Sequence, residues 1–291
     1  MMFNGYNEEL VQTIKGWLHE DVGSGDITTR TTIPAGHESK GIIHAKEDGI
    51  ICGIPVAELV FEVVDPSLVF TALVQEGQAI TKGTVIAEVE GSTHAILTGE
   101  RLALNLMQRL SGVASRTHSF VQKLEGLPSR LVDTRKTTPG HRMLEKYAVR
   151  VGGGANHRFG LYDAVMIKDN HIKGAGGIRQ AVARARANIP HTMTIEVETE
   201  SLEQVEEALA AGADIIMLDN MSSELMTEAV RRIKTKAPHV KTEASGNVSL
   251  ETVRHIAETG VDVISVGRLT YSFASLDISL DLNAKKEEPF S

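Results

Sequence analysis

This sequence has a single cysteine, no long apolar run and no net positive charge. Cys52 is the only cysteine among 291 residues, so an intrachain disulfide is excluded and a reducing compartment is indicated. The apolar runs are far shorter than the ~20 residues that a membrane helix needs. The opening MMFNGYNEEL lacks the basic and apolar regions of a secretory signal. We therefore expect a cytoplasmic protein without a membrane partner.

The formal net charge is −8 and the isoelectric point is about 5.8. Such a chain lacks the basic face that general nucleic-acid or membrane-surface binding requires. Residues 130–173 nevertheless hold nine Lys and Arg against four Asp and Glu. This basic segment predicts a binding site for a small anion. The alternative is a basic helix face paired with acids elsewhere in the chain.

Two regions differ in their patterns. Residues 1–115 combine a helical pattern at 7–20 with short strands at 40–48, 68–77 and 83–91, and a long helical pattern follows at 97–124. We assign 1–115 to an N-terminal α/β domain and 116–270 to a second domain, and expect the tail 271–291 to pack back on the first. The turn that holds Lys82 resembles that of biotinyl and lipoyl carriers, and we interpret it as structural.

The second region alternates short apolar runs with helical patterns. The runs occupy 130–134, 164–169, 192–198, 214–220, 240–245 and 262–267. In three of these places an Asp stands just before the apolar residues, at 163, 214 and 262, with a Gly two or three residues before it. The patterns at 201–212 and 249–260 both start at Ser and end at Gly, as helices do. Strand–helix alternation of this kind predicts a parallel sheet, either a nearly closed α/β barrel or an open doubly wound sheet.

In an α/β barrel the site forms where the strands end. The first two runs end in cations, the middle runs in carboxylates and the last two in glycine-containing loops. Arg135 and Arg158 can grip carboxylate or phosphate oxygens, and Lys136, Lys168 and His157 add charge. These residue types predict a polyanionic ligand with carboxylates at its basic end.

The opposite end of the predicted site is acidic and rich in glycine. Glu198 and Asp219 suit Mg²⁺ or sugar hydroxyls, and a phosphorylated sugar would fill this end. The glycines of VGGGANHRFG (151–160) do not form a dinucleotide motif. We expect them to let the loop approach a ligand closely and to place His157 and Arg158.

Seven stretches together resemble the quinolinate phosphoribosyltransferase family. They are EDVGSGDITT (20–29), ERLALNLMQRLSGVAS (100–115), the forty-residue block DTRKTTPGHRMLEKYAVRVGGGANHRFGLYDAVMIKDNHI (133–172), IEVET, MLDNM, EASGNV and VDVISVGRLTYSFASLDISLDL. The central block is the most specific of these, and the resemblance spans nearly the whole chain.

The resemblance implies transfer of a phosphoribosyl group from phosphoribosyl pyrophosphate to quinolinate. The products are nicotinate mononucleotide, pyrophosphate and CO₂, with Mg²⁺ as the cofactor. It further implies a hammerhead-like N-terminal α/β domain and an incomplete α/β barrel of the TIM type. The assembly would be a head-to-tail homodimer with shared active sites, and larger assemblies stay open.

The resemblance also implies roles for individual residues. Arg135, His157, Arg158 and Lys168 match the residues that hold the pyridine dicarboxylate, with Thr134 and Lys136 as their neighbours. Arg101 matches an arginine from the partner subunit. Glu198 and Asp219 match the carboxylates at the ribose and the metal. The phosphate loops match Ser245, Gly246, Asn247, Val266, Gly267 and Arg268. We expect catalysis to depend on Lys136, Lys168, Glu198 and Asp219.

Two residues depart from the family pattern, and two other functions stay open. Tyr271 stands where His is expected, and Asn247 stands where a second Gly is common. A Schiff-base aldolase could use Lys168 as its strand-end amine, although the surrounding arginines argue against a carbonyl substrate. A phosphoribosyltransferase-like protein of molybdate uptake would share much of the pattern.

Overall fold

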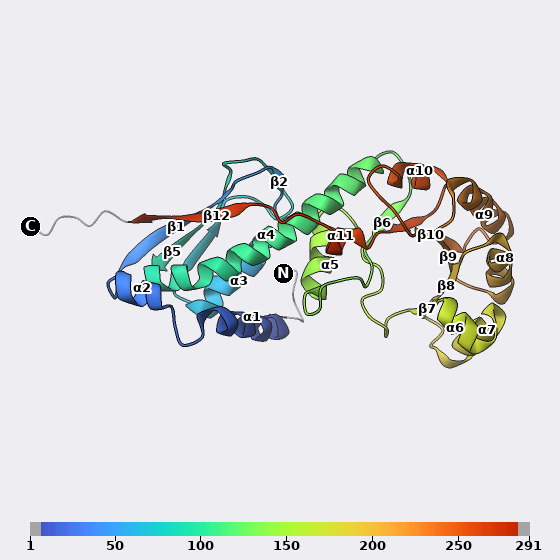
Figure 1. Cartoon of the computed structure of the whole chain (residues 1–291), viewed down its shortest axis with the longest axis horizontal. Coiled ribbons are helices and arrows are strands. Elements are labelled where there is room, and N and C mark those ends of the chain that lie inside the picture. Colours follow the sequence, from blue (N-terminus) through green and yellow to red (C-terminus); the bar gives the residue numbers. More distant parts are fainter. Residues whose placement is uncertain (1–6, 285–291) are drawn as a thin grey trace, which may run out of the picture. The chain divides into compact units, whose positions relative to one another are not determined.

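The computed structural model describes residues 7–284, which fall into two compact units (Figure 1). One unit is Arg116–Phe273, and the other comprises the described residues on either side of it. Within the described residues, no helix combines the length and apolarity needed to span a membrane. The C-terminal tail is described as far as residue 284, and the rest of the predicted tail segment, 285–291, lies outside the described residues.

The N-terminal unit is built on an antiparallel sheet. Its four strands run in the order β12-β1-β5-β3, so the C-terminal strand pairs with the first strand of the unit. Residues of β1 alternate between buried and partly exposed, as expected for a sheet covered on one face. The strands are β1 (Glu38–Ala45), β2 (Gly49–Ile50), β3 (Val69–Ala72), β4 (Ala79–Ile80), β5 (Val85–Ser92) and β12 (Ile278–Ala284).

Helices accompany this sheet. They are α1 (Asn7–Val22), α2 (Ile27–Thr32), α3 (Ile54–Val64) and the first part of α4 (Thr93–Lys123). Strand β4 pairs with β2 rather than with β5, and the main-chain N–H of Lys82 donates to Asp48 at 2.8 Å. The Lys82 turn is therefore a local structural turn and does not connect two paired strands.

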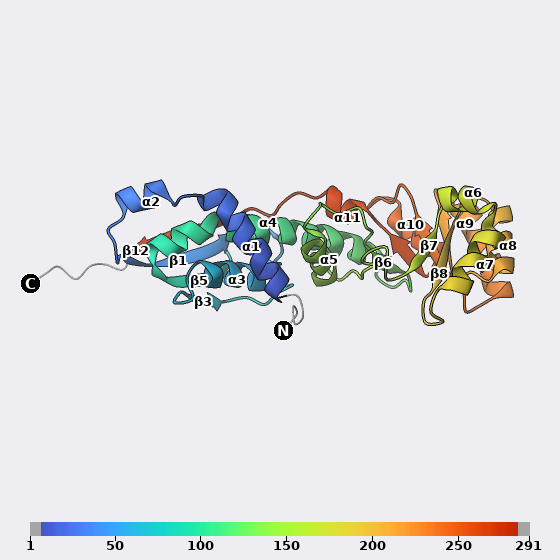
Figure 2. The same cartoon turned by 90° about the horizontal axis from the view of Figure 1, so that it is seen from below.

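The second unit contains six parallel strands with helices along the chain between them. The strands are β6 (Arg130–Val132), β7 (Val165–Ile167), β8 (Ile195–Thr199), β9 (Ile215–Asp219), β10 (Lys241–Ser245) and β11 (Val263–Ser265). The helices are α5 (Arg142–Val151), α6 (Asp169–Ala175), α7 (Ile178–Asn188), α8 (Leu202–Ala211), α9 (Ser223–Lys236), α10 (Val253–Glu258) and α11 (Arg268–Tyr271). Figures 1 and 2 show α7, α8 and α9 along the outer side of the strands.

The strand order identifies the architecture. It reads β6-β11-β10-β9-β8-β7, so strands follow chain order around the sheet and the first pairs with the last. This is the order of an α/β barrel that is left open between β6 and β7. The prediction of an incomplete barrel is confirmed, and the doubly wound alternative is wrong.

The open edge of β6 is covered by the segment that follows α5. The N–H of Ala155 donates to the Leu131 carbonyl at 2.8 Å, and the N–H of Asp133 donates to the Ala155 carbonyl at 3.2 Å. A Cβ on Gly154 would lie 2.9 Å from side-chain atoms of Thr117 and Val149. The expectation that these glycines approach a ligand is therefore wrong for Gly154, which packs closely against α4 and α5.

The repeated Asp residues lie at the amino ends of the strands. Asp214 accepts from the N–H of Ile195 at 2.7 Å, and Asp262 accepts from the N–H of Thr242 at 2.8 Å. Each thereby binds the start of the preceding strand, a position associated with stability in barrels. Asp163 differs, because it accepts from the main chain of the loop just before it.

The two predicted Ser-to-Gly helices differ in length. Helix α8 begins after Ser201, whose hydroxyl accepts from the N–H of Gln204, and ends at Gly212 with φ 81°. The matching segment forms only the six-residue helix α10. There the Ser249 N–H donates to the Thr252 hydroxyl, which holds a turn in place of the first helical turn.

Asp262 allows a test of the hydrogen bonds between an Asp before one strand and the start of the preceding strand. Burial raises its pKa, but hydrogen bonds from Lys234 and Thr242 outweigh burial and lower that pKa to about 2. A lowered folded-state pKa stabilises the protein above the unfolded-state value, ~3.9, and this contribution is lost as the pH falls toward 2. We expect Asp262→Asn to cost about 1–2 kcal/mol near pH 7 and less below about pH 4.

Thermal denaturation of Asp262→Asn and wild type at matched concentrations, from pH 7 to pH 3, measures this difference. Asp21→Asn, at an exposed position on α1, is the control and should show no pH-dependent difference. A deficit that stays constant down to pH 3 would contradict the assignment.

Candidate active site

Two adjoining pockets lie where the barrel strands end. The first, about 300 Å³, we name the cationic pocket, and the second, about 480 Å³, the polar pocket. Both are lined by Thr134, Lys136, Lys168, Ser245 and Ser265. The first pocket is also lined by Arg135, His157, Arg158, Met166, Met217 and Glu243. The second is also lined by Glu198, Asp219, Asn220, the 245–248 loop, the 266–268 loop and Tyr271.

The structure thus brings together all but one of the residues predicted from the sequence for the site. They come from the ends of all six strands and from the 157–158 segment. Arg101 is the exception, because it lies on α4 in the N-terminal unit, with its side chain 58% exposed and near Glu100.

Two arginines dominate the cationic pocket. The Nε atoms of Arg135 and Arg158 are buried, and neither has a hydrogen-bond partner among the described residues. Burial lowers the pKa of Arg158, and the charge of Arg135 lowers it further. Two guanidinium groups held together with unused donors need anionic oxygens as partners. Met166 and Met217 add polarisable apolar surface, which suits contact with an aromatic ring.

A buried ion pair supports this pocket from behind. Lys146 of α5 donates to Asp133, which follows β6, and both side chains are at most 2% exposed. Asp133 also accepts from the N–H of His157 at 2.9 Å and from the Asn156 amide at 2.6 Å. The carboxylate therefore fixes the main chain immediately before Arg158.

His157 is held between two buried glutamates. Its Nε2 lies 3.3 Å from Glu196 and 3.4 Å from Glu243. Burial lowers the pKa of His157, but hydrogen bonds to the two carboxylates outweigh burial and raise that pKa. Nδ1 of the same ring accepts from the N–H of Arg158 at 2.7 Å, which places the ring proton on Nε2, between the carboxylates. The possible metal-ligand atoms of His157, Glu196 and Glu243 lie within 4.8 Å of one another, a spacing that suits a metal ion. The Nε2 proton and the adjacent Arg158 oppose a cation there, so we interpret the cluster as a hydrogen-bonded one.

Several lining residues were not predicted as site residues from the sequence: Met166, Met217, Asn220, Glu243, Val248, Ser265 and Tyr271. Glu196, which contacts His157 but lines neither pocket, was not predicted either. Glu196 and Glu243 lie within β8 and β10 rather than after them, and both are 3% exposed. An acid inside an otherwise buried strand is the signal that could have identified them. Nothing in the sequence separates Met166 and Met217 from ordinary core residues.

The polar pocket carries the predicted carboxylates. Lys168 donates to Glu198 at 2.5 Å, and Asp219 accepts from the Asn220 amide at 2.7 Å. Glu198 and Asp219 line one pocket with Lys136 and Arg268. Two carboxylates beside cations suit Mg²⁺, which keeps several waters and takes further ligands from phosphates. The Lys168 amine is thus engaged by Glu198, whereas a Schiff-base aldolase needs it to attack a carbonyl.

The loops after β9 and β10 are joined by a hydrogen bond. Asn220 and Asn247 have φ of 53° and 48°, the left-handed region. The Asn247 amide donates to Asn220 at 3.1 Å, and Asn220 in turn donates to Asp219. Gly246, with φ 90°, leaves no room for a Cβ beside the Asn220 side chain. Asn247 is therefore compatible with a position where Gly is common, because Asn tolerates this conformation.

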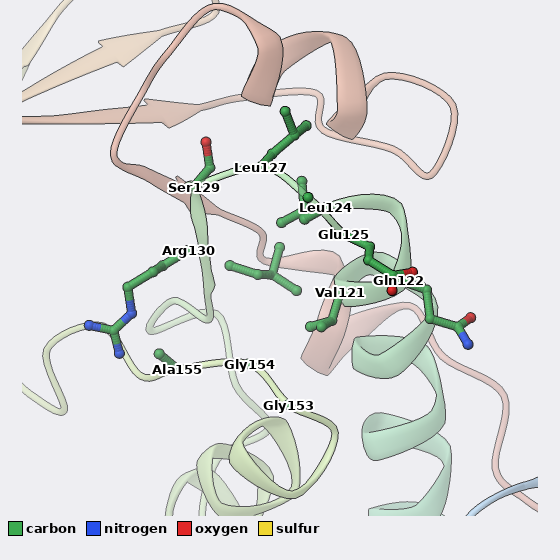
Figure 3. A pocket seen from close by; sticks show the side chains of 12 residues that line it. Val121, Gln122, Leu124, Glu125, Leu127, Ser129, Arg130, Gly153, Gly154 and Ala155 are labelled. Carbon is green, nitrogen blue, oxygen red and sulfur yellow. The ribbon is translucent and has the colours of Figure 1, made fainter.

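A larger cavity lies elsewhere in the barrel unit. It measures about 650 Å³ and is lined by the end of α4, the start of β6 and residues 153–155 (Figure 3). None of the predicted site residues lines it, and its two strand residues, Arg130 and Leu131, lie at the start and middle of β6 rather than at its end. Size alone therefore does not identify the active site.

Comparison with known proteins assigns the chain to a family. The models "Quinolinate phosphoribosyl transferase, N-terminal domain" and "C-terminal domain" match residues 26–111 and 113–281. The chain belongs to the quinolinate phosphoribosyl transferase family. It is 46% identical to a probable carboxylating nicotinate-nucleotide pyrophosphorylase of Bacillus subtilis over 96% of this chain and 95% of the relative. A Synechocystis protein of the same name is 51% identical over 73% and 72%.

Solved structures agree with this assignment. NadC from Streptococcus pyogenes has a TM-score of 0.90 at 44% identity and covers 94% of this chain and 96% of its own. The nicotinate-nucleotide pyrophosphorylase from Francisella tularensis has a TM-score of 0.90 at 39% identity and covers 95% and 97%. The family assignment supports a quinolinate phosphoribosyltransferase over an aldolase or a protein of molybdate uptake.

The left-handed conformation of Asn247 predicts that its Gly and Ala variants differ in stability. Asn247→Gly keeps the left-handed backbone and loses one exposed hydrogen bond, so we expect nearly wild-type stability. Asn247→Ala must carry a Cβ in that conformation, so we expect an additional cost of about 1–2 kcal/mol. Thermal denaturation of both variants measures the difference. Equal stability of the Gly and Ala variants would show that the left-handed backbone is not required.

Proposed function

We propose that this chain transfers a phosphoribosyl group to quinolinate and removes one carboxylate as CO₂, giving nicotinate mononucleotide and pyrophosphate in NAD biosynthesis. The observation that carries the proposal is the junction of two pockets of different chemistry that share Lys136 and Lys168. The relatives reported above are named carboxylating nicotinate-nucleotide pyrophosphorylases.

Quinolinate would occupy the cationic pocket. Its two neighbouring carboxylates would accept from Arg135, Arg158 and the shared lysines, and its ring would lie against Met166 and Met217. The two guanidinium groups that line the pocket support this placement, because neighbouring like charges favour anionic oxygens as partners. His157 lines the same pocket and would lie beside the dicarboxylate.

Phosphoribosyl pyrophosphate would occupy the polar pocket. Glu198 and Asp219 would hold the ribose hydroxyls and Mg²⁺, and the loops at 245–247 and 266–268 would surround the 5′-phosphate. The shape of these loops supports the assignment, because main-chain N–H groups in tight glycine turns bind phosphate. The metal would neutralise charge on the departing pyrophosphate.

The reaction then needs fixed charges more than proton transfers. The pyridine nitrogen of quinolinate attacks the anomeric carbon of the sugar as pyrophosphate leaves. Carboxylates at the sugar favour the positive charge that develops there, and cations stabilise the leaving group. The bond between ring C2 and its carboxylate then breaks. The electron pair left at C2 is stabilised by the adjacent cationic nitrogen, and C2 takes up a proton.

The central experiment combines purified protein, quinolinate, phosphoribosyl pyrophosphate and Mg²⁺ and follows nicotinate mononucleotide. We expect turnover by wild type, and for Arg135→Ala a KM for quinolinate raised about tenfold or more, because a two-pronged carboxylate contact is lost. The KM for phosphoribosyl pyrophosphate should change little. Absence of product, or an unchanged quinolinate KM in the variant, would contradict the function or the residue role respectively.

We further propose a homodimer in which Arg101 completes the partner's site. Its guanidinium supports this, because it is exposed and lies 3.9 Å from the carboxylate of Glu100 in a loose ion pair. Arg101→Ala and Lys168→Ala should each be inactive, whereas verified mixed dimers should regain activity. Random mixing makes half of the dimers mixed, with one intact site each, or about a quarter of wild-type activity. Mixed dimers without activity would contradict shared sites.

A further inference from the structure

Helix α5 carries a polar row that contacts the site without lining it. Arg142 and Lys146 stand four residues apart in its first two turns, so they lie on one side of the helix. Neither lines the cationic pocket. Both are bonded to the two segments that carry the pocket's arginines, residues 133–137 and 157–159.

Arg142 joins these segments through its whole guanidinium group. Nε donates to the Thr137 hydroxyl at 3.0 Å, Nη2 to the Arg135 carbonyl at 3.4 Å and Nη1 to the Phe159 carbonyl at 3.1 Å. One planar group thus fixes the main chain at Arg135 and next to Arg158. A lysine could not reproduce this, because its ammonium is a single point without a fork.

Lys146 repeats the connection one turn deeper. It donates to Asp133 and, at 3.1 Å, to the carbonyl of His157. Between them on the helix, buried Glu145 accepts from the N–H of Thr138 at 3.1 Å. Helix α5 therefore binds both segments twice, through Arg142 and, one turn further along the helix, through Lys146.

The pocket needs such a connection for an electrostatic reason. Arg135 and Arg158 carry like charges, and the effect of Arg135 on the pKa of Arg158 shows that they repel each other. Glu196 and Asp163 attract Arg158, but each does so less strongly than Arg135 repels it. Two loop segments free to separate would relieve this repulsion and would lose the spacing that a dicarboxylate requires.

We propose that Arg142 is a positioning residue that, together with Lys146, holds Arg135 and Arg158 at the separation that accepts two neighbouring carboxylates on one ring. This inference rests on the proposed function, since it concerns the binding of quinolinate. Its distinctive consequence is selectivity. Loss of the connection should weaken dicarboxylate binding far more than monocarboxylate binding, because one carboxylate can follow one displaced arginine.

The test measures binding by calorimetry, separately from turnover. The probes are quinolinate, its stable analogue phthalate, and benzoate, which has a single carboxylate. The variants are Arg142→Lys, which keeps the charge, and Arg142→Gln, which does not. Thr137→Val removes one acceptor with little change of shape. Arg150→Gln removes an exposed arginine from the end of the same helix and is the control.

We expect both Arg142 variants to bind phthalate and quinolinate about tenfold to a hundredfold more weakly, because a misplacement of about 1 Å has effects of this size. Benzoate binding should fall much less. Thr137→Val should show a smaller loss of the same kind, and Arg150→Gln should match wild type. These results, with melting temperatures near wild type, would support positioning.

Wild-type phthalate affinity in Arg142→Lys would overturn the proposal, because charge alone would then suffice. Equal losses for phthalate and benzoate would overturn it as well, since they indicate general damage to the pocket. Failure of the wild type to bind quinolinate or phthalate would instead refute the proposed function, and the inference with it.

Discussion

The carboxylate of Asp133 is the group on which the arrangement of the site depends. It lies at the end of β6, is fully buried and accepts from Lys146, from the Asn156 amide and from the main chain of His157. Burial raises the pKa of Asp133 and lowers that of Lys146, so the surroundings favour neither charge by itself. Removal of one partner from such a pair typically costs about 3–5 kcal/mol, because the other charge stays buried alone.

That buried pair solves a problem created by the open barrel. Strand β6 has a free edge toward β7, and the chain returns along it at Ala155 after α5. A single pair of main-chain hydrogen bonds is a weak attachment for a segment that carries His157 and Arg158. Asp133 binds the same segment two residues further on, so the strand end and the returning chain become one unit. Residues 155–157 thereby cover the edge of β6 in a fixed position.

Much of this could be predicted from the sequence because it depends on local pattern. Apolar runs alternating with helical patterns indicated the barrel, and polar residues after each run indicated the site from Thr134 to Arg268. What could not be predicted depends on side chains distant in sequence. Lys146 reads as an ordinary helix charge, and its partner Asp133 is thirteen residues away. Glu196 and Glu243 belong to different strands, and only the parallel registers bring them both to His157.

The buried glutamates also explain why a pocket built for anions contains acids. Alone, a buried imidazole would lose its proton, because burial disfavours its charged form. Glu196 and Glu243 stand 3.3 and 3.4 Å from Nε2 of His157, and Arg158 attracts Glu196 as well. These acids cost the dicarboxylate some attraction, yet they hold the ring at Nε2 while the N–H of Arg158 holds it at Nδ1. Preorganised polar groups of this kind need no rearrangement as the reaction proceeds. In this chain the same logic operates twice, since Asp133 fixes the main chain at His157 just as the glutamates fix its ring.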